Sequence, residues 1–329
     1  MTKSACLSAI SSSSCMIASV VPSKCSKNPW KIILLEKRSE SMIQDITPHE
    51  YRNEYRPVKP EKESYVIVCK QNSILIKESE HEIAFPTFGE MECWNERLYE
   101  EYTYLFSIDQ HRFYYIKNVS WEKLTEYHME PVSNFRTLQP QYMAFAGITG
   151  AQLIRWYESR QFCGRCGAKM VHDGKERMMR CETCGLMEYP KICPAVIVGL
   201  TDGNRILMSK YAGRAYKKYA LLAGFAEIGE TIEETVRREV MEEVGLQVKN
   251  IRFYKSQPWS FSDTLLMGFY CELDGEDKIT LDREELALAE WFEREDIPDM
   301  ENDVSLTNEM IRYFKNHGNC VDNLKTHKV

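Results

Sequence analysis

Short runs of β-branched and aromatic residues, separated by two polar residues, dominate the N-terminal third of the chain. The runs form two pairs: 65–70 with 73–77, and 102–108 with 111–116. Two such runs joined by a two-residue turn predict a β-hairpin. Farther along, Leu153, Trp156 and Tyr157 stand at helical spacing and predict a helix over residues 141–161.

A second series of strands and helices is predicted in the C-terminal half. The apolar runs 194–200 and 205–210 flank Thr-Asp-Gly-Asn, a strong turn signal. Thr231 and Glu234 form a capping-box pattern that starts a helix, and Gly245 is placed to end it. Further elements are expected as strands over 248–257, 264–273 and around Trp291, and as a helix near 305–316. This mixed order of strands and helices predicts an α/β or α+β sandwich rather than a helical bundle.

Composition and charge narrow the class of protein. The 329 residues are 28% charged and 43% hydrophobic, which is ordinary for a globular protein of two or three domains. The net charge of −7 supplies no overall positive field to attract nucleic acid or a membrane surface. No apolar run approaches the roughly 18 residues that a membrane-spanning helix needs. A dedicated DNA-binding protein is therefore not expected.

The first 41 residues differ in composition from the rest. They are rich in serine, with Lys3 near the start and no arginine before Arg38. A secretory signal needs a positive start and an uninterrupted apolar stretch, and a mitochondrial presequence is rich in arginine. Neither pattern is present. We therefore expect residues 1–41 to be a disordered tail, or an upstream extension with the natural start at Met42.

Eight of the twelve cysteines are dispersed along the chain. They are Cys6, Cys15, Cys25, Cys69, Cys93, Cys193, Cys271 and Cys320. Isolated cysteines inside apolar runs are typical of a reducing compartment, where they pack as small hydrophobic residues. This pattern indicates a cytoplasmic protein.

The other four cysteines, Cys163, Cys166, Cys181 and Cys184, form two Cys-x-x-Cys pairs separated by 14 residues. Each pair can turn two thiolates toward one point, and two pairs complete the tetrahedral set that Zn²⁺ prefers. A glycine after each pair permits the tight turn. Two disulfides are the alternative, but they conflict with a reducing compartment. We expect one structural zinc per chain, with no coordination position left open.

The helix predicted to begin after Thr231 carries unusual negative charge. Three valines spaced four apart supply an apolar stripe: Val236, Val240 and Val244. Glu239, Glu242 and Glu243 are then grouped on an adjoining face. Two carboxylates about 5 Å apart repel by roughly 3 kcal/mol at an effective dielectric near 20. A hard cation such as Mg²⁺ or Mn²⁺ would make the group favourable; the alternative is a solvated acidic face.

The spacing of seven residues favours a divalent-cation site over a solvated acidic face. Every fixed position of the pattern G-x5-E-x7-R-E-U-x-E-E-x-G-U is matched, by Gly224, Glu230, Arg238, Glu239, Glu242, Glu243 and Gly245, with Val240 and Leu246 at the aliphatic positions U. This segment resembles the Nudix box. The resemblance implies metal-dependent hydrolysis of a nucleoside diphosphate linked to another group. It implies catalytic roles for Glu239, Glu242 and Glu243, supported by an ion pair between Glu230 and Arg238.

Residues 256–264, SQPWSFSDT, are similar to the signature S-Q-P-W-P-F-P-x-S of the NADH pyrophosphatase (NudC-type) subfamily. Ser260 and Ser262 replace two prolines, and Thr264 replaces a serine while keeping a hydroxyl group. Each lost proline increases the freedom of the unfolded loop by about 0.4–1 kcal/mol. We therefore expect a less preorganised loop. The alternative for Trp259 and Phe261 is that they are ordinary core residues.

The resemblance extends over residues 140–316 and implies the site residues one by one. The implied ligands of the divalent metal are the Ala223 carbonyl and the carboxylates of Glu239, Glu243 and Glu285. The implied substrate contacts are Glu176, Tyr189, Phe225, Gln257, Pro258, Trp259, Ser260, Phe261, Ser262, Asp263, Thr264 and Thr307. Tyr189, Phe225 and Trp259 would stack near the nicotinamide, and Thr307 would lie near the adenylate. A homodimer is also implied, because sites of this subfamily are built across two chains.

The implied fold class is α+β, a Nudix α/β/α sandwich preceded by a zinc ribbon and an N-terminal mixed β/α domain. The expected parts are a tail (1–41), the N-terminal domain (42–160), the ribbon (161–190), the Nudix domain (191–318) and a C-terminal tail (319–329). The implied reaction is hydrolysis of NADH or NAD⁺ to NMN(H) and AMP, and by the same chemistry the removal of an NAD cap from RNA. Two alternatives remain: a broader dinucleotide or ADP-ribose pyrophosphatase, and a non-catalytic ligand- or RNA-binding protein on a Nudix scaffold.

Overall fold

The computed structural model describes residues 42–213, 218–299 and 304–318, all within the unit Ser39–Val329. The tails expected at 1–41 and 319–329 therefore lie outside the described residues. No helix in these three described ranges is both long enough and apolar enough to cross a membrane.

Two small sheets form the N-terminal domain. One has the strand order β1-β6-β7-β2, and in the other β4 pairs with β3, β5 and β8. The strands are β1 (Tyr51–Arg52), β2 (Tyr65–Ile67), β3 (Cys69–Lys70), β4 (Ser73–Ser79), β5 (Glu82–Ala84), β6 (Thr103–Ile108), β7 (His111–Tyr115) and β8 (His128–Pro131). The hairpin of β6 with β7 is confirmed, and the first hairpin is confirmed next to its turn, where β3 pairs antiparallel with β4. The rest of the predicted arm 65–70 is wrong, because β2 pairs in parallel with β7 in the other sheet. Gln71 and Asn72 both have positive φ, as a tight two-residue hairpin turn requires.

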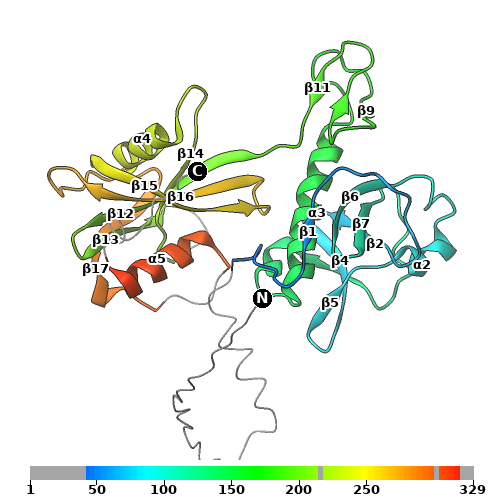
Figure 1. The fold of residues 1–329 in the computed structure, drawn as a ribbon, viewed down its shortest axis with the longest axis horizontal. Helices are drawn as coiled ribbons and strands as arrows, with labels where there is room; N and C mark the ends of the chain where they lie inside the picture. The colour runs from blue at the N-terminus through cyan, green and yellow to red at the C-terminus, as the bar shows by residue number, and fades with distance from the viewer. Residues whose placement is uncertain (1–41, 214–217, 300–303, 319–329) are drawn as a thin grey trace, which may run out of the picture. The chain divides into compact units, whose positions relative to one another are not determined.

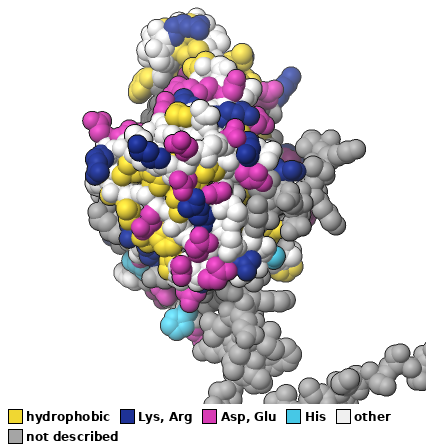
Figure 2. All heavy atoms as spheres, turned by 90° about the vertical axis from the view of Figure 1, so that its left-hand side faces the viewer, with side chains coloured by type: hydrophobic (Ala, Val, Ile, Leu, Met, Phe, Trp, Pro, Cys, Tyr) yellow, Lys and Arg dark blue, Asp and Glu magenta, His cyan; other side chains and the backbone are white. Residues whose placement is uncertain are grey.

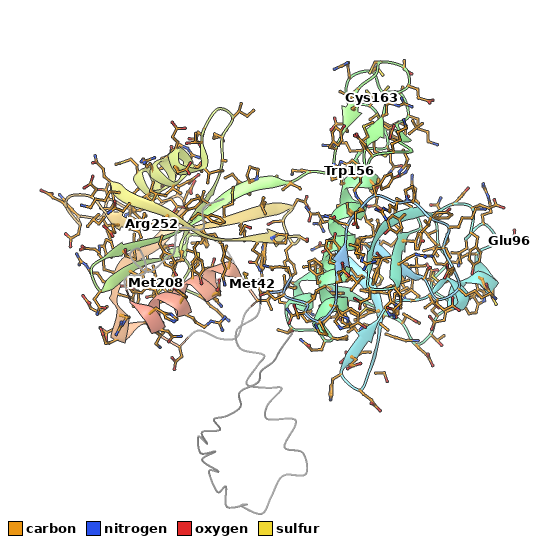
Figure 3. All side chains as sticks on the ribbon, viewed as in Figure 1. Met42, Glu96, Trp156, Cys163, Met208 and Arg252 are labelled. Atoms are coloured by element: carbon orange, nitrogen blue, oxygen red, sulfur yellow. The ribbon has the colours of Figure 1, made fainter. Side chains whose placement is uncertain are left out.

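Helices close this domain and lead into the next. Short helical turns occupy α2 (Phe88–Met91), η1 (Glu92–Trp94) and η2 (Val132–Arg136), and the long helix α3 spans Gln141–Ser159. The predicted helix over 141–161 is thus confirmed. One face of α3 is buried against the core that also contains Phe106, Phe113 and Phe135. Trp156 lies on the last turns of α3, shortly before Cys163 opens the ribbon (Figure 3).

The ribbon is a three-stranded sheet in the order β11-β10-β9. Its strands are β9 (Val171–His172), β10 (Met179–Arg180) and β11 (Met187–Glu188). A sheet this small buries little apolar surface, so it needs another source of stability.

A six-stranded sheet forms the centre of the C-terminal domain, in the order β15-β16-β12-β13-β17 with β14 paired to β12. The elements are β12 (Cys193–Asp202), β13 (Arg205–Tyr211), β14 (Leu222–Phe225), α4 (Ile232–Val244), β15 (Val248–Trp259), β16 (Thr264–Leu273), β17 (Leu286–Glu293), η3 (Arg294–Asp296) and α5 (Leu306–His317). The predicted strands and both helices of this half are confirmed. Among the pairings, β12 with β16 is parallel.

Successive side chains of the central strands point to opposite faces of this sheet, so that a hydrophobic core forms on each face. On β12, Val196 and Val198 face the cluster that contains α4, whereas Ile197 faces the cluster that contains α5. On β16, Phe269 and Tyr270 divide in the same way. Helices α4 and α5 therefore lie on opposite faces of the sheet, which confirms the α/β/α sandwich (Figure 1).

The surface of this domain carries charges of both signs. On the face shown in Figure 2, lysine and arginine side chains are interspersed with aspartate and glutamate. This distribution agrees with the modest net charge of −7.

Candidate active site and zinc ribbon

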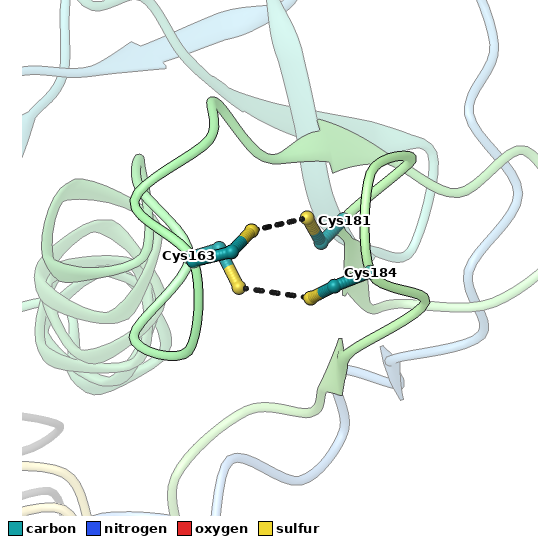
Figure 4. Close-up of side chains that lie close together, drawn as sticks. Cys163, Cys181 and Cys184 are labelled. Atoms are coloured by element: carbon teal, nitrogen blue, oxygen red, sulfur yellow. Dashed lines mark hydrogen bonds between the residues drawn. The ribbon is translucent and has the colours of Figure 1, made fainter.

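The four clustered cysteines converge at one point in the ribbon. Their Sγ atoms all lie within 4.8 Å of one another, and the pairs Cys163–Cys184 and Cys166–Cys181 are 3.5 Å apart (Figure 4). A disulfide requires about 2.05 Å, so the disulfide alternative is wrong. A tetrahedron with Zn–S bonds of about 2.3 Å has S···S edges of about 3.8 Å. The donor set and its spacing thus fit Zn²⁺.

In the two Cys-x-x-Cys turns, called knuckles below, backbone N–H groups favour the thiolate form of Cys163 and Cys181. The N–H of Arg165 donates to Cys163 Sγ at 3.4 Å. Backbone N–H groups of Cys184 and Thr183 lower the pKa of Cys181 to about 6. The backbone N–H of Ala168 lowers the pKa of Cys166, but hydrogen bonding with Cys181 and burial outweigh it and raise that pKa to about 12. The thiolate, which is the form that binds metal, is therefore favoured at Cys163 and Cys181 but not at Cys166.

Helix α4 forms for the reasons that its sequence predicts. The capping box is complete, because Thr231 accepts from the Glu234 N–H and the Glu234 carboxylate accepts from the Thr231 N–H. Gly245 ends the helix with φ +69°, a left-handed conformation that favours glycine. The three valines of the stripe are fully buried. Each valine so buried contributes about 1.5–3 kcal/mol, which offsets the unfavourable crowding of carboxylates.

Arg238 connects the carboxylates of the Nudix box. The predicted ion pair is present, with Arg238 Nε 2.5 Å from Glu230 Oε1 and Nη2 3.0 Å from Glu230 Oε2. Nη1 donates to Glu239 and Glu242, each at 2.8 Å, and Nη2 also donates to the Phe225 carbonyl at 2.9 Å. The guanidinium lowers the pKa of Glu230 to about 2. The pair therefore stays ionised at neutral pH and fixes the other carboxylates around it.

Two of the three clustered glutamates are buried. Glu239 is 8% exposed and Glu243 is 2% exposed, whereas Glu242 is exposed. A solvated acidic face is therefore the wrong description for Glu239 and Glu243. Burial raises the pKa of Glu239, although the hydrogen bond from Arg238 opposes the shift. Buried carboxylates at a cavity fit a divalent cation, because the ion offsets the cost of their burial.

Gly224 makes room for the Glu239 carboxylate. A Cβ at this position would lie 1.9 Å from Glu239 Cδ and about 2 Å from both carboxylate oxygens. No L side chain fits there without displacing the glutamate. The glycine that begins the Nudix box thus has a packing reason, since β14 and α4 approach each other directly at this point.

A cavity of about 590 Å³ lies beside these carboxylates. Nine of the predicted site residues line it: Ala223, Phe225, Arg238, Glu239, Trp259, Ser262, Thr264, Glu285 and Thr307. They come from β14, α4, the end of β15, the turn between β15 and β16, the start of β16, the turn before β17, and the start of α5. Segments far apart in the sequence thus form one site with a carboxylate side and aromatic groups.

The other predicted site residues lie outside this cavity. Glu230 and Glu242 are bonded to Arg238, which lines the cavity, and Glu243 is buried on α4. Gln257 is fully buried and donates to the Val304 carbonyl at 2.8 Å, while its own oxygen accepts from the Leu306 N–H at 2.7 Å. Its amide therefore attaches the signature strand to the start of α5.

Pro258 and Ser260 line a separate cavity of about 560 Å³. Phe261 packs partly against the N-terminal core, and Asp263 binds Arg155. The core alternative is thus partly correct for Phe261, whereas Trp259 lines the main cavity.

In the ribbon, Glu176 and Tyr189 contact each other rather than the cavity. The Tyr189 hydroxyl donates to Glu176 Oε2 at 2.8 Å, and the ring is 54% exposed. Neither residue lines the cavity formed by the same chain. A role for this pair in substrate binding remains a prediction.

The three carboxylates predicted to bind a divalent metal are not gathered as the cysteines are. Within the described ranges, the cysteine cluster is the only group of at least three metal-binding side chains whose ligand atoms lie within 4.8 Å of one another. Glu239 and Glu285 nevertheless line the same cavity. The Glu239 carboxylate forms an ion pair with Arg238, with 2.8 Å between Oε1 and Nη1.

Arg136 is a cavity residue that the sequence reasoning missed. Its guanidinium carbon lies 4.7 Å from the Trp259 ring centre and 5.0 Å from that of Phe261, whose rings are 4.7 Å apart. The residue ends η2 in the N-terminal domain and lines the main cavity. No motif marks it, because its place depends on the packing of η2 against the signature loop.

Comparisons with known proteins support this description. The NUDIX domain family model matches residues 191–314, and that of the NADH pyrophosphatase zinc ribbon domain matches residues 158–189. The NAD-capped RNA hydrolase NudC of Photorhabdus laumondii is 37% identical over 182 residues, which cover 54% of this chain and 70% of that protein. The chain belongs to the Nudix family, with the NADH pyrophosphatase zinc ribbon.

Other relatives of this Nudix protein match a shorter segment. The NAD-capped RNA hydrolase NudC of Pectobacterium atrosepticum is 42% identical over 151 residues, covering 46% of this chain and 58% of that protein. The chain therefore spans less than two thirds of the length of this relative. A crystal structure of a NUDIX hydrolase from Nitrosomonas europaea is 25% identical, with a TM-score of 0.41, and covers 48% of this chain and 93% of that one.

Proposed function

We propose that this Nudix protein is a metal-dependent diphosphatase that hydrolyses NADH or NAD⁺ to NMN(H) and AMP. The observation that carries the proposal is the cavity of about 590 Å³, which the Nudix carboxylate Glu239 lines together with the signature residue Trp259. A dinucleotide requires both, because its pyrophosphate needs charge compensation and its bases need stacking surfaces. The names of the relatives, NAD-capped RNA hydrolases, agree with this chemistry.

The divalent site would use the Ala223 carbonyl with the carboxylates of Glu239, Glu243 and Glu285. Mg²⁺ or Mn²⁺ bound there would neutralise the pyrophosphate and lower the pKa of the attacking water. Glu230 holds Arg238 by a bidentate ion pair, and Arg238 in turn orients Glu239 and Glu242. Of the three proposed carboxylate ligands, the chain thus fixes Glu239 before substrate arrives, and a bound ion would draw Glu243 and Glu285 toward it.

The rest of the cavity would hold the dinucleotide. Trp259 and Phe225 offer aromatic faces, and Ser262 and Thr264 offer hydroxyl groups that also bond each other at 2.9 Å. Arg136 adds a positive charge beside the Trp259 ring. We propose that this charge faces a phosphate of the substrate, because the net charge near the glutamates is otherwise negative.

We also propose a homodimer and a second substrate. Glu176 and Tyr189 lie outside the cavity of their own chain, and a second chain would bring them to it. Tyr189, Met187 and Ile192 are each more than half exposed, which leaves apolar surface for such a contact. NAD-capped RNA is proposed as a substrate because the same pyrophosphate bond is cut.

Product identification tests the function. Purified protein with Mg²⁺ or Mn²⁺ should convert NADH to AMP and NMNH, identified by mass, with kcat/KM higher than for ADP-ribose or diadenosine substrates. Glu243→Gln should abolish turnover while zinc content stays at one per chain. Glu233→Gln is the matched control, because Glu233 is exposed on the same helix. The absence of AMP, or full activity of Glu243→Gln, would reject the proposal.

A further inference from the structure

Arg155, on helix α3 of the N-terminal domain, contacts the signature loop of the Nudix domain. Its Nη2 donates to the Ser260 carbonyl at 2.6 Å and to Asp263 Oδ1 at 2.6 Å. Both charged side chains are mostly buried, with 30% of Arg155 and 23% of Asp263 exposed. Hydrogen bonds between ionised groups are among the strongest in proteins. One nitrogen thus joins the two ends of the turn that connects β15 to β16.

The turn needs such support. Asp263 has φ +58°, which few residues other than glycine adopt without cost. Ser260 and Ser262 impose no restriction on the backbone of the kind that proline imposes. Within the turn, the Ser262 N–H donates to the Trp259 carbonyl at 3.2 Å, which is a long hydrogen bond.

Both residues held by Arg155 adjoin residues of the cavity. Ser260 follows Trp259, and Asp263 precedes Thr264, and both of these neighbours line the cavity. A shift of the turn would therefore move an aromatic face and a hydroxyl group together. If only a fraction of molecules holds the turn in place, the apparent dissociation constant rises by the inverse of that fraction.

We propose that Arg155 is a positioning residue that preorganises the signature loop, so that the N-terminal domain sets substrate affinity in the Nudix domain. It contacts the loop and not the cavity, so it acts through Trp259 and Thr264. The proposal rests on the proposed function for its kinetic consequence. Its structural consequence, the ordering of the loop, is independent of any activity.

The test combines kinetics with hydrogen exchange. Arg155→Met keeps the length of the side chain but removes the guanidinium. We expect KM for NADH to rise about tenfold with kcat within twofold, and amides of residues 256–266 to exchange faster while those of α4 stay unchanged. Arg155→Lys retains a donor and a charge, so it should recover part of the KM. Arg160→Met, at the C-cap that follows the same helix and paired with Glu188 rather than with the loop, is the control and should match the wild type.

Each remaining result decides against the proposal or against the function. An unchanged KM, or unchanged exchange in 256–266, overturns the positioning role. Faster exchange throughout the chain also overturns it, because Arg155 then contributes only to overall stability. If the wild type hydrolyses no dinucleotide, the proposed function fails, and the exchange data alone decide whether Arg155 orders the loop.

Discussion

Gly224→Ala is the smallest change that tests the geometry of the proposed site. The new Cβ would lie 1.9 Å from Glu239 Cδ, whereas real contacts of this kind essentially never fall below 3.0 Å. The carboxylate must therefore retreat by about 1 Å, the scale of displacement that costs roughly 100-fold in rate. It has little room to do so, because Glu239 is only 8% exposed and is bonded to Arg238 at 2.8 Å.

The expected result separates catalysis from folding. Overpacking of this kind costs about 1–3 kcal/mol of stability, or a fall in Tm of a few degrees for each kcal/mol. We expect a folded protein with one zinc per chain whose kcat for NADH falls about 100-fold, equivalent to roughly 2.7 kcal/mol in the barrier.

The assay follows AMP release with Mg²⁺, alongside the melting temperature and zinc content. Gly174→Ala is the matched control, since a Cβ there meets no atom within 4 Å, and it should keep wild-type activity. If Gly224→Ala retained more than a tenth of the wild-type kcat, the placement of Glu239 against Gly224 would have no part in the reaction.

Three further predictions concern the zinc ribbon, the acid stability and the aromatic side of the cavity. Cys181→Ser should lose the zinc and lower Tm, because three thiolates hold the ion less firmly than four; retention of one zinc per chain would contradict the four-ligand assignment. Burial raises the pKa of Glu90, but hydrogen bonds from Lys77, Thr87 and Tyr127 outweigh it and bring the pKa from 4.5 to about 2. The stability that Glu90 contributes is therefore present above pH 4.5 and lost as the pH falls toward 2, so Glu90→Gln should lower Tm at pH 7 and flatten its decline on the acid side. An unchanged Tm–pH profile would contradict the shift. Trp259→Ala should raise KM for NADH at least fivefold, because a stacked base is worth about 1–3 kcal/mol, whereas Trp259→Phe should keep most of the affinity; equal KM values for all three proteins would rule out stacking.

Local chemistry explains which elements could be predicted. The hairpin turns, the capping box at Thr231 and the left-handed Gly245 each depend on residues within a few positions of one another. The alternation along β12 and β16 belongs to the same class, because it divides side chains between two faces whatever the partners are. The zinc cluster was predictable too, since four ligands in two short knuckles leave few other arrangements.

The candidate site was predictable only in part. The Nudix spacing places Glu239, Glu242 and Glu243 on one helix, but spacing does not show which of them are buried. The structure buries two and exposes the third. The serines of the signature loop led to the expectation of a less preorganised loop. The hydrogen bonds from Arg155 supply restraint that the loop sequence does not contain.

The sequence by itself determined the strands, the helix caps, the zinc ligands and the family pattern, because each is encoded by neighbours along the chain. Only the tertiary structure decided that Gln257 serves packing, that Arg136 reaches the cavity, and that Arg155 holds a turn more than 100 residues away. Such contacts depend on how α3 and η2 pack against the Nudix domain. No local pattern predicts that packing, because the residues next to an arginine in the sequence do not show which distant group its guanidinium will contact.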